Sequence, residues 1–218
     1  WYINVIIPAL VFKFCKSNAI DLLIDSNSIT NIVIMNFLSI DCSSETNSLF
    51  IKYKNKIFSK LLQSDKFIND SLAKLIIDFM KGNDINLNNL STIFINQGPG
   101  NFSSLRSSLA IAKGFSISKN LKLFGYNTFI WACTNFFNKN DTIYSLLTFK
   151  EKYFIQKFDK NLKAVSKPTE TKETDIINKY CNELIVTPKH STKNINKKIL
   201  KIKNLQIVDL SHKELEFL

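Results

Sequence analysis

The chain has 218 residues, of which 45% are hydrophobic and 22% charged, and its formal net charge is +11. This length suits one large domain or two modest lobes, and the composition excludes disordered, collagen-like and multi-span membrane chains. The four cysteines, at positions 15, 42, 133 and 181, form no C-x-x-C pair; they favour a reducing compartment, so we expect a cytoplasmic protein without membrane contact.

Lysine dominates the positive charge: 28 of the 29 basic residues are lysine, and lysine, isoleucine, asparagine and phenylalanine together make up 100 residues. All four have A- or T-rich codons, so genomic drift explains much of the charge without an RNA site. A basic RNA-binding module is kept as an alternative. The single arginine, Arg106, either is a chance survivor or serves where only a planar, bidentate guanidinium works.

Residues 1–34 begin with Trp1 and precede the first methionine, Met35. We interpret them as an extraneous upstream segment, the alternative being an additional native strand or interfacial segment. Three strands are then predicted at 37–42, 48–53 and 56–62, joined as hairpins. A helix follows over 65–81, with Ser64 as its N-cap and Gly82 as its stop. It carries one apolar stripe, which is either core or a surface for a partner helix: Ile68, Leu72, Leu75, Ile76 and Phe79.

The next elements alternate between strand and helix. We predict a buried strand at 92–96, a turn, a helix to Lys119, a strand at 122–125 and a helix at 128–137. After the break at 138–140 come strands at 143–149 and 153–158, a helix at 174–182, strands at 184–186 and 205–210, and a last helix opened by the capping-box pair Ser211 and Glu214. This order predicts an α/β protein with mixed sheets flanked by helices. Its N-terminal lobe covers 35–137, and its C-terminal lobe, 138–218, is short and suggests truncation.

The turn at 96–106 is the strongest local signal, because it lies between a strand and a helix. Gly98 and Gly100 permit unusual backbone torsions, Pro99 presets the turn, and Asn101 or Ser103 can cap the helix. Free N–H groups at such a helix start suit a phosphate or carboxylate. The alternative is merely a tight connection. The segment matches neither a Walker loop nor a dinucleotide fingerprint.

Two other features are weaker. Asp41 and Ser43 place an acid and a hydroxyl in the first hairpin turn, where local turn geometry explains them equally well. Ser107, Ala110, Gly114 and Ser118 line one side of the second helix, which predicts that another backbone approaches Gly114: either the sheet beneath or a helix of another chain. The two histidines, His190 and His212, form no metal-binding or catalytic motif.

Several motifs resemble the bacterial TsaB (YeaZ) family. L-S-I-D-C-S-S-E at 38–45 is similar to its opening strand and turn, and G-P-G-N-F-S-S-L-R at 98–106 is similar to its G-P-G-S-F-T-G-L-R signature. A-K-G at 112–114 and G-Y-N-T at 125–128 also match the pattern. The resemblance covers residues 35–137 and is faint beyond.

The resemblance implies an actin-like, ribonuclease H-like fold of the sugar-kinase type, with two related lobes. It implies a non-catalytic subunit that supports a catalytic paralogue, TsaD, in threonylcarbamoyl transfer to the adenosine beside the anticodon of tRNA, together with the ATPase TsaE. It implies no cofactor of its own, with ATP or ADP at the partner interface, and the free chain can form a homodimer. The implied site residues fall into two groups. Those near nucleotide are Asp41, Ser43, Gly98, Pro99, Gly100, Asn101, Ser103 and Arg106. Those at the partner interface are Ile68, Leu72, Leu75, Ser107, Ala110 and Gly114.

Two departures from the family pattern concern the nucleotide or RNA contacts. Ser104 stands where the signature has its second internal glycine, and Thr148-Phe149-Lys150 stands where the second lobe often has Asp-Ala-Arg. The alternative function is a nucleotide-hydrolysing or peptidase-like enzyme of the same fold.

Overall fold

The computed structural model describes the backbone of residues 35–43, 47–62 and 68–217. The upstream segment 1–34 and the predicted cap at Ser64 lie outside the described residues. None of the helices described is both long enough and apolar enough to cross a membrane.

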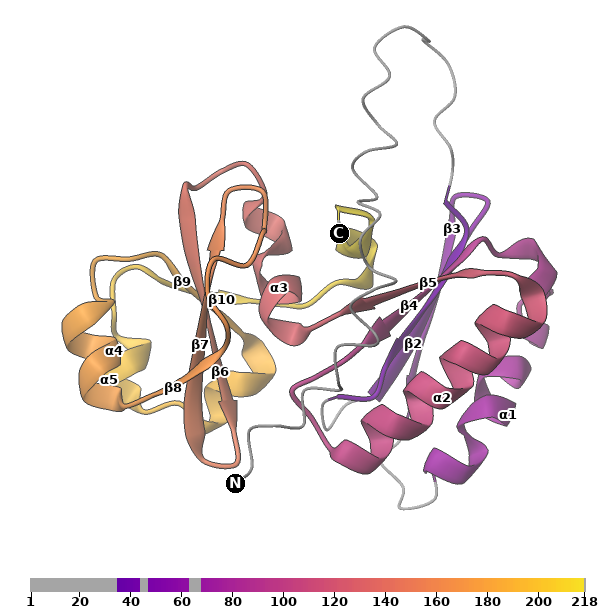
Figure 1. The fold of residues 1–218 in the computed structure, drawn as a ribbon, viewed down its shortest axis with the longest axis horizontal. Helices are drawn as coiled ribbons and strands as arrows, with labels where there is room; N and C mark the ends of the chain where they lie inside the picture. The colour runs from indigo at the N-terminus through magenta and orange to yellow at the C-terminus, as the bar shows by residue number, and fades with distance from the viewer. Residues whose placement is uncertain (1–34, 44–46, 63–67, 218) are drawn as a thin grey trace, which may run out of the picture.

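Two five-stranded sheets stand side by side (Figure 1). The first has the order β3-β2-β1-β4-β5, and its strands are β1 (Phe37–Asp41), β2 (Asn47–Tyr53), β3 (Lys56–Leu62), β4 (Thr92–Asn96) and β5 (Lys122–Tyr126). The strands β1, β2 and β3 are antiparallel neighbours, whereas β4 and β5 run parallel to β1. The sequence predicts these strands within one or two residues, because each is bounded by turn residues and carries an apolar pattern.

The second sheet repeats this plan. Its order is β10-β9-β6-β7-β8, formed by β6 (Thr142–Phe149), β7 (Lys152–Asp159), β8 (Thr169–Thr171), β9 (Ile185–Pro188) and β10 (Leu205–Val208). The first three strands are again antiparallel, and β9 and β10 again run parallel to the first strand of their sheet. Two lobes of equal topology, each a mixed sheet flanked by helices, form the predicted actin-like architecture.

Helices α1 (Ile68–Lys81) and α2 (Phe102–Lys119) cover one face of the first sheet (Figure 1). Leu72, Ile76 and Phe79 of α1 pack there on alternate residues of the central strands, such as Leu38 and Ile40. The apolar stripe of α1 is therefore core. The fully buried residues of α2 are small, Ser108 and Ala112, and Leu109, Ile111 and Phe115 pack on the same core beside them.

The opposite face of the first sheet is aromatic and looks toward the second lobe. Phe37, Phe50, Phe94 and Tyr126 form a cluster there with Trp131. Helix α3 (Thr128–Cys133) lies between the sheets (Figure 1), so Trp131 faces the first sheet while Phe129, Ala132 and Cys133 pack on the second. Helix α3 therefore packs against both sheets.

Helices α4 (Glu173–Lys179) and α5 (Lys197–Leu200) cover the outer face of the second sheet (Figure 1). Short 3-10 turns complete the chain at η1 (Leu87–Asn89), η2 (Thr134–Phe136), η3 (Lys189–Asn194) and η4 (His212–Phe217). Three predictions need correction: the helix expected at 128–137 tightens into η2 after Cys133, the helix expected at 174–182 ends at Lys179, and the helix expected after Ser211 is the 3-10 turn η4.

Candidate functional site

A hydrogen-bonded junction joins the carboxyl ends of β1 and β4 to the start of α3. At the end of β1, Asp41 is buried, and its Oδ1 accepts hydrogen bonds from the Ser43 backbone N at 2.9 Å and the Ser43 Oγ at 2.6 Å. This is the local Asx-type turn that the sequence offered as the alternative to a ligand site. The hydroxyl of Ser43 also accepts a bond from Asn96, so the turn is fixed to the next strand.

Asn96, the last residue of β4, is the centre of the junction. Its Nδ2 donates to Ser43 Oγ at 2.9 Å and to Thr128 Oγ1 at 3.1 Å, while its Oδ1 accepts from the Gly98 N at 2.9 Å. The Thr128 N in turn donates to the Gly98 carbonyl at 2.9 Å. Neither Asn96 nor Thr128 was among the predicted site residues. A polar residue ending a buried apolar strand was the signal that could have identified Asn96.

The glycines of the turn are required by geometry. Gly98 has φ +102°, a conformation that other residues rarely adopt. At Gly100 a Cβ would lie 2.2 Å from the Ser43 carbonyl oxygen, because the turn rests directly against the backbone that follows β1. The structure therefore brings Asp41, Ser43, Gly98 and Gly100 together through direct packing and hydrogen bonds.

The electrostatics of this junction follow from burial. Burial raises the pKa of Asp41, and the hydrogen bonds from Ser43 and Asn96 offset part of that rise. Burial and the neighbouring Asp41 raise the pKa of the Cys42 thiol to about 12, so it is protonated at neutral pH. Within the described parts of the chain, no group of three His, Cys, Asp or Glu side chains is placed to hold a metal ion.

At the start of α2, Asn101 acts as the N-cap. Its Oδ1 accepts from the backbone N of Ser103 at 3.0 Å and of Ser104 at 3.3 Å, so these two N–H groups are already bonded. Arg106 does not anchor the glycine turn. It is exposed, and its guanidinium carbon lies 5.1 Å from the centroid of the Phe102 ring. Within the described residues the guanidinium makes no hydrogen bond or ion pair.

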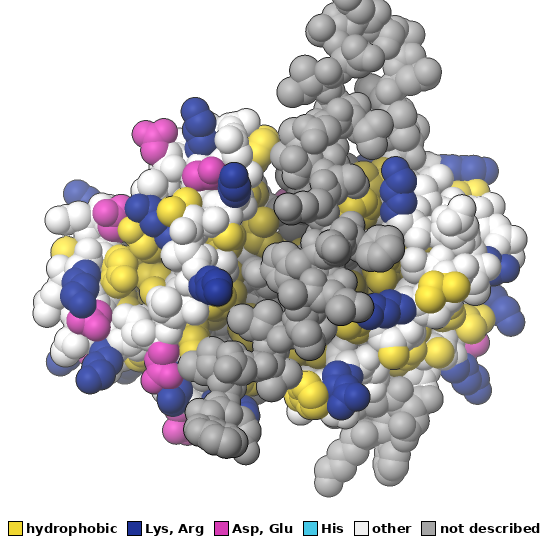
Figure 2. Space-filling view, in the orientation of Figure 1, with side chains coloured by type: hydrophobic (Ala, Val, Ile, Leu, Met, Phe, Trp, Pro, Cys, Tyr) yellow, Lys and Arg dark blue, Asp and Glu magenta, His cyan; other side chains and the backbone are white. Residues whose placement is uncertain are grey.

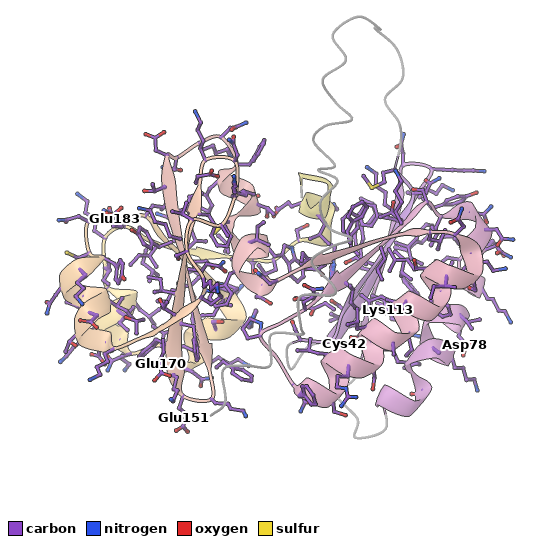
Figure 3. All side chains as sticks on the ribbon, viewed as in Figure 1. Cys42, Asp78, Lys113, Glu151, Glu170 and Glu183 are labelled. Carbon is purple, nitrogen blue, oxygen red and sulfur yellow. The ribbon has the colours of Figure 1, made fainter. Side chains whose placement is uncertain are left out.

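A second candidate surface lies on the outer side of α2. A Cβ at Gly114 would meet nothing within 4 Å, so the expectation that the sheet beneath approaches this glycine is wrong. Ala110 and Gly114 are exposed, Ser107 is partly exposed, and Ile117 is 83% exposed. We call Phe102, Arg106, Ala110, Gly114 and Ile117 the outer stripe of α2; their spacing places them on one side of the helix. Lys113 follows the same spacing and is also exposed (Figure 3).

The predicted interface residues of α1 are placed differently. Leu72 is 1% exposed and packs inside its own lobe, so the prediction that it contacts a partner is wrong for this conformation. Leu75 is partly buried against the same core, and the side chain of Ile68 lies outside what the structure describes. On the outer side of α1, Ile77 is 37% exposed. The surface available to a partner therefore centres on α2, with Ile77 as the contribution of α1.

His212, which the sequence gave no reason to select, connects the two lobes. Its Nδ1 lies 3.0 Å from Ser39 Oγ, its Nε2 lies 2.8 Å from Ser48 Oγ, and its ring stacks on Phe50 at 5.4 Å. Burial lowers the pKa of His212 to about 4, so the imidazole is neutral at pH 7. Ser39 and Ser48 come from strands some 170 residues earlier, so no local motif could reveal this contact.

Comparison with known proteins finds similarity over a central part of the chain. The model of the family TsaD, tRNA N6-adenosine threonylcarbamoyltransferase, matches residues 64–147. The tRNA threonylcarbamoyladenosine biosynthesis protein TsaB of Buchnera aphidicola subsp. Baizongia pistaciae (strain Bp) is 34% identical over 86 residues, which cover 38% of this chain and 38% of that protein. The resemblance to the TsaB family predicted from the motifs is thus confirmed, and the chain aligns with well under half of this curated relative.

Two solved structures share the fold over most of the chain. YeaZ from Pseudomonas aeruginosa superposes with a TM-score of 0.62 at 11% identity, covering 84% of this chain and 90% of that one. A second structure, described as an uncharacterized protein with similarity to peptidase YEAZ from Pseudomonas aeruginosa, gives a TM-score of 0.61 at 10% identity and covers 84% and 88%. At these identities the similarity concerns the fold, and it extends through both lobes.

Proposed function

We propose that this chain is a non-catalytic subunit in tRNA threonylcarbamoyladenosine biosynthesis, which binds and supports a TsaD-like catalytic paralogue through the outer stripe of α2. The observation that carries the proposal is the position of this stripe. It lies within residues 64–147, the segment that the TsaD family model matches, and its apolar and small residues face away from the core of their own lobe. This chain and a TsaD-like paralogue are related in this segment, so each presents a similar helix pair. The two helix pairs can therefore pack against each other across a pseudo-symmetric interface.

The composition of the stripe suits a helix from a partner. Ala110 and Gly114, in its middle, allow two helix backbones to approach closely. Phe102, which is 52% exposed, and Ile117 at the other end supply apolar area that is costly to leave in water. Arg106 stands on Phe102, and its donors are unpaired within the described residues, as suits a carboxylate of the partner. Aromatic and arginine side chains are enriched in binding hot spots.

A supporting role also agrees with the chemistry of the junction at the end of β1. The Asp41 Oδ1 and the Ser43 hydroxyl are occupied by bonds within the junction. The thiols of Cys42 and Cys133 each have a pKa of about 12, raised mainly by burial, so neither is a ready nucleophile at neutral pH. In this proposal the threonylcarbamoyl transfer takes place on the paralogue.

The remaining partners are part of the same proposal. A TsaE-like ATPase and tRNA join through the complex, and ATP or ADP binds at the partner interface near the 98–103 turn rather than in a site of this chain alone. The outer stripe also allows the free chain to form a homodimer, since a symmetric pair would bury the same side chains.

Gel filtration with light scattering tests this function. The full chain is run alone, and then mixed with the TsaD paralogue of the same organism. We expect a stable one-to-one complex that displaces any homodimer, and we expect threonylcarbamoylation of tRNA by the paralogue to depend on the added chain. A folded chain that forms no complex would contradict the proposal, and measurable nucleotide hydrolysis by the chain alone, lost in Gly100→Val, would favour the enzyme alternative.

A further inference from the structure

One segment of the second lobe is rich in lysine. Residues 189–203 contain six lysines and no aspartate or glutamate, whereas the overall frequency of 28 lysines in 218 residues predicts about two in fifteen. Drift in composition raises lysine everywhere, so it does not by itself account for this local excess. Elsewhere, lysine and arginine side chains are scattered over both lobes (Figure 2).

The fold turns four of these lysines outward together. Around α5, Ile195 and Ile199 are 6% and 0% exposed and pack against the second sheet with Ile185 and Leu146. Ile202 packs on the same core, so the lysines that lie between and beside these apolar residues face solvent. All four are exposed, and we call them the α5 lysine surface: Lys197, Lys198, Lys201 and Lys203. Asn196 fixes the start of the helix by accepting from the Lys198 N at 2.9 Å.

None of the four lysines is neutralised within the described part of the chain. The ion pairs of this lobe join Lys152 to Glu170, Lys179 to Asp175 and Lys189 to Asp209. Glu173 of α4 accepts a hydrogen bond from Asn196 Nδ2 at 3.0 Å rather than from a lysine. Four unpaired ammonium groups within seven residues create a local potential that attracts a polyanion.

We infer that the α5 lysine surface binds the phosphate backbone of RNA. Ammonium groups on flexible stems are suited to sequence-independent contacts with phosphates. An anionic membrane would require exposed apolar residues among the lysines, but Ile199 is fully buried, and Leu200 and Ile202 pack on the core. A protein partner would require an apolar or aromatic anchor, and the exposed large apolar residues of this lobe, Val165 and Ile207, lie outside residues 195–203.

This inference extends the proposed function, because the RNA would be the tRNA that the complex modifies. The surface lies on the outer face of the second sheet, whereas the outer stripe lies on the first lobe (Figure 1). The chain can therefore hold its protein partner and an RNA backbone at the same time. Such a contact positions tRNA without reading its sequence.

The test compares two variants of the full chain that lose the same four charges. One replaces Lys197, Lys198, Lys201 and Lys203 by glutamine; the control replaces Lys56, Lys122, Lys139 and Lys160, which are also exposed but dispersed. Binding of unfractionated tRNA is measured by fluorescence anisotropy from about 50 to 200 mM salt, alone and with the paralogue. We expect wild type to show a log–log salt slope of about −3 to −4, as for four phosphate contacts.

The α5 variant should bind tRNA at least about tenfold more weakly at the lowest salt, with a nearly flat salt dependence, while the control loses less than about threefold. Equal losses in both variants, or no tRNA binding by wild type either alone or in the complex, would overturn the inference. So would tighter binding to vesicles containing phosphatidylserine than to tRNA. Gel filtration of the α5 variant with the paralogue separates the two proposals, since complex formation should be unchanged.

Discussion

Glycine is required at position 100 for a reason that position 114 does not share. At Gly100 a Cβ would lie 2.2 Å from the carbonyl oxygen and 2.6 Å from the Cα of Ser43, which are backbone atoms that cannot rotate away. At Gly114 the same atom would meet nothing within 4 Å. Packing within the chain therefore requires a glycine at position 100. At position 114 nothing within the described chain requires one, and the exposed backbone there is available for contact with another chain.

We predict that Gly100→Ala lowers the free energy of unfolding by about 1–3 kcal/mol, because the turn must move away from β1. Gly114→Ala is the matched control; it should raise the free energy of unfolding by about 0.5–1 kcal/mol, since alanine is the better helix former and has room. Urea denaturation followed by circular dichroism measures both. Equal effects of the two substitutions would contradict the packing described at Gly100.

His212 should make stability depend on pH. Its pKa is about 4 in the folded chain against 6.5 for an ordinary histidine, so the folded state disfavours the protonated ring. The contribution of the neutral ring is fully present above about pH 6.5 and is lost as the pH falls toward 4, by at most about 3 kcal/mol. In His212→Gln this dependence should disappear. The raised pKa of Asp41 acts in the opposite direction, but it is common to both proteins and cancels in the difference.

Urea midpoints at pH 7, 6 and 5 test the prediction for His212. The wild-type curve should approach that of the variant as the pH decreases, because below about pH 6.5 the unfolded chain takes up a proton on this histidine that the folded chain, with its neutral ring against Ser39 and Ser48, does not accept. Parallel curves at all three pH values would show that the ring is not held in its neutral form.

The sequence predicted the helices and strands whose apolar pattern is long or is bounded by clear turn residues. Helix α1 has an apolar stripe, and β4 is a buried run that ends in a glycine turn. The strand β8 and the helix α5 were missed because three and four residues are too few for a periodic signal. Asn196, which caps α5, was the available clue.

The orientation of α2 could not be predicted from hydrophobicity. Its buried residues are the small Ser108 and Ala112, while Phe102 and Ile117 face outward. Leu109, Ile111 and Phe115 also pack on the core, so large apolar residues lie on both sides of this helix, and the usual rule that apolar residues point inward does not select one side. The motif marked the glycine turn, but it could not show that Asn96 and Thr128 hold this turn together from different elements.

The outer stripe makes a prediction for Gly114→Leu. The added side chain enters open space, so folding should be preserved, but it would keep a partner helix from approaching α2. We expect binding to the paralogue to weaken at least about tenfold, a cost of about 1.4 kcal/mol. Asn178→Leu on α4 is the control, because it also adds an exposed leucine, but on the second lobe. Isothermal titration calorimetry measures affinity, and unchanged affinity in Gly114→Leu would place the interface elsewhere.

At the scale of the whole molecule, the two lobes share one topology and are joined twice. Helix α3 leads from the first sheet into the second, and the segment after β10 returns to the first sheet. In that return segment, the Ser211 carbonyl accepts from Trp131 Nε1 at 3.0 Å, and Glu214 Oε2 accepts from Thr134 Oγ1 at 2.7 Å. The two connections enclose the aromatic face of the first sheet.

Leu215 is the apolar anchor of the return segment and should couple the unfolding of the lobes. It is 0% exposed and packs with Phe37, Phe94 and Trp131. Leu215→Ala should therefore cost about 2–5 kcal/mol, as for other buried leucines, and most of that loss falls on the contact between the lobes. Lys213→Ala, an exposed change in the same segment, should leave stability within about 0.5 kcal/mol of wild type.

Two probes show whether this coupling exists. Tryptophan fluorescence includes Trp131 at the contact between the lobes, and circular dichroism reports the backbone of both lobes. In wild type the two urea transitions should coincide, as for a single cooperative unit. In Leu215→Ala the fluorescence transition should come first, because the return segment leaves Trp131 before the sheets unfold. Coincident transitions at a lower midpoint would mean instead that α3 alone suffices to couple the lobes.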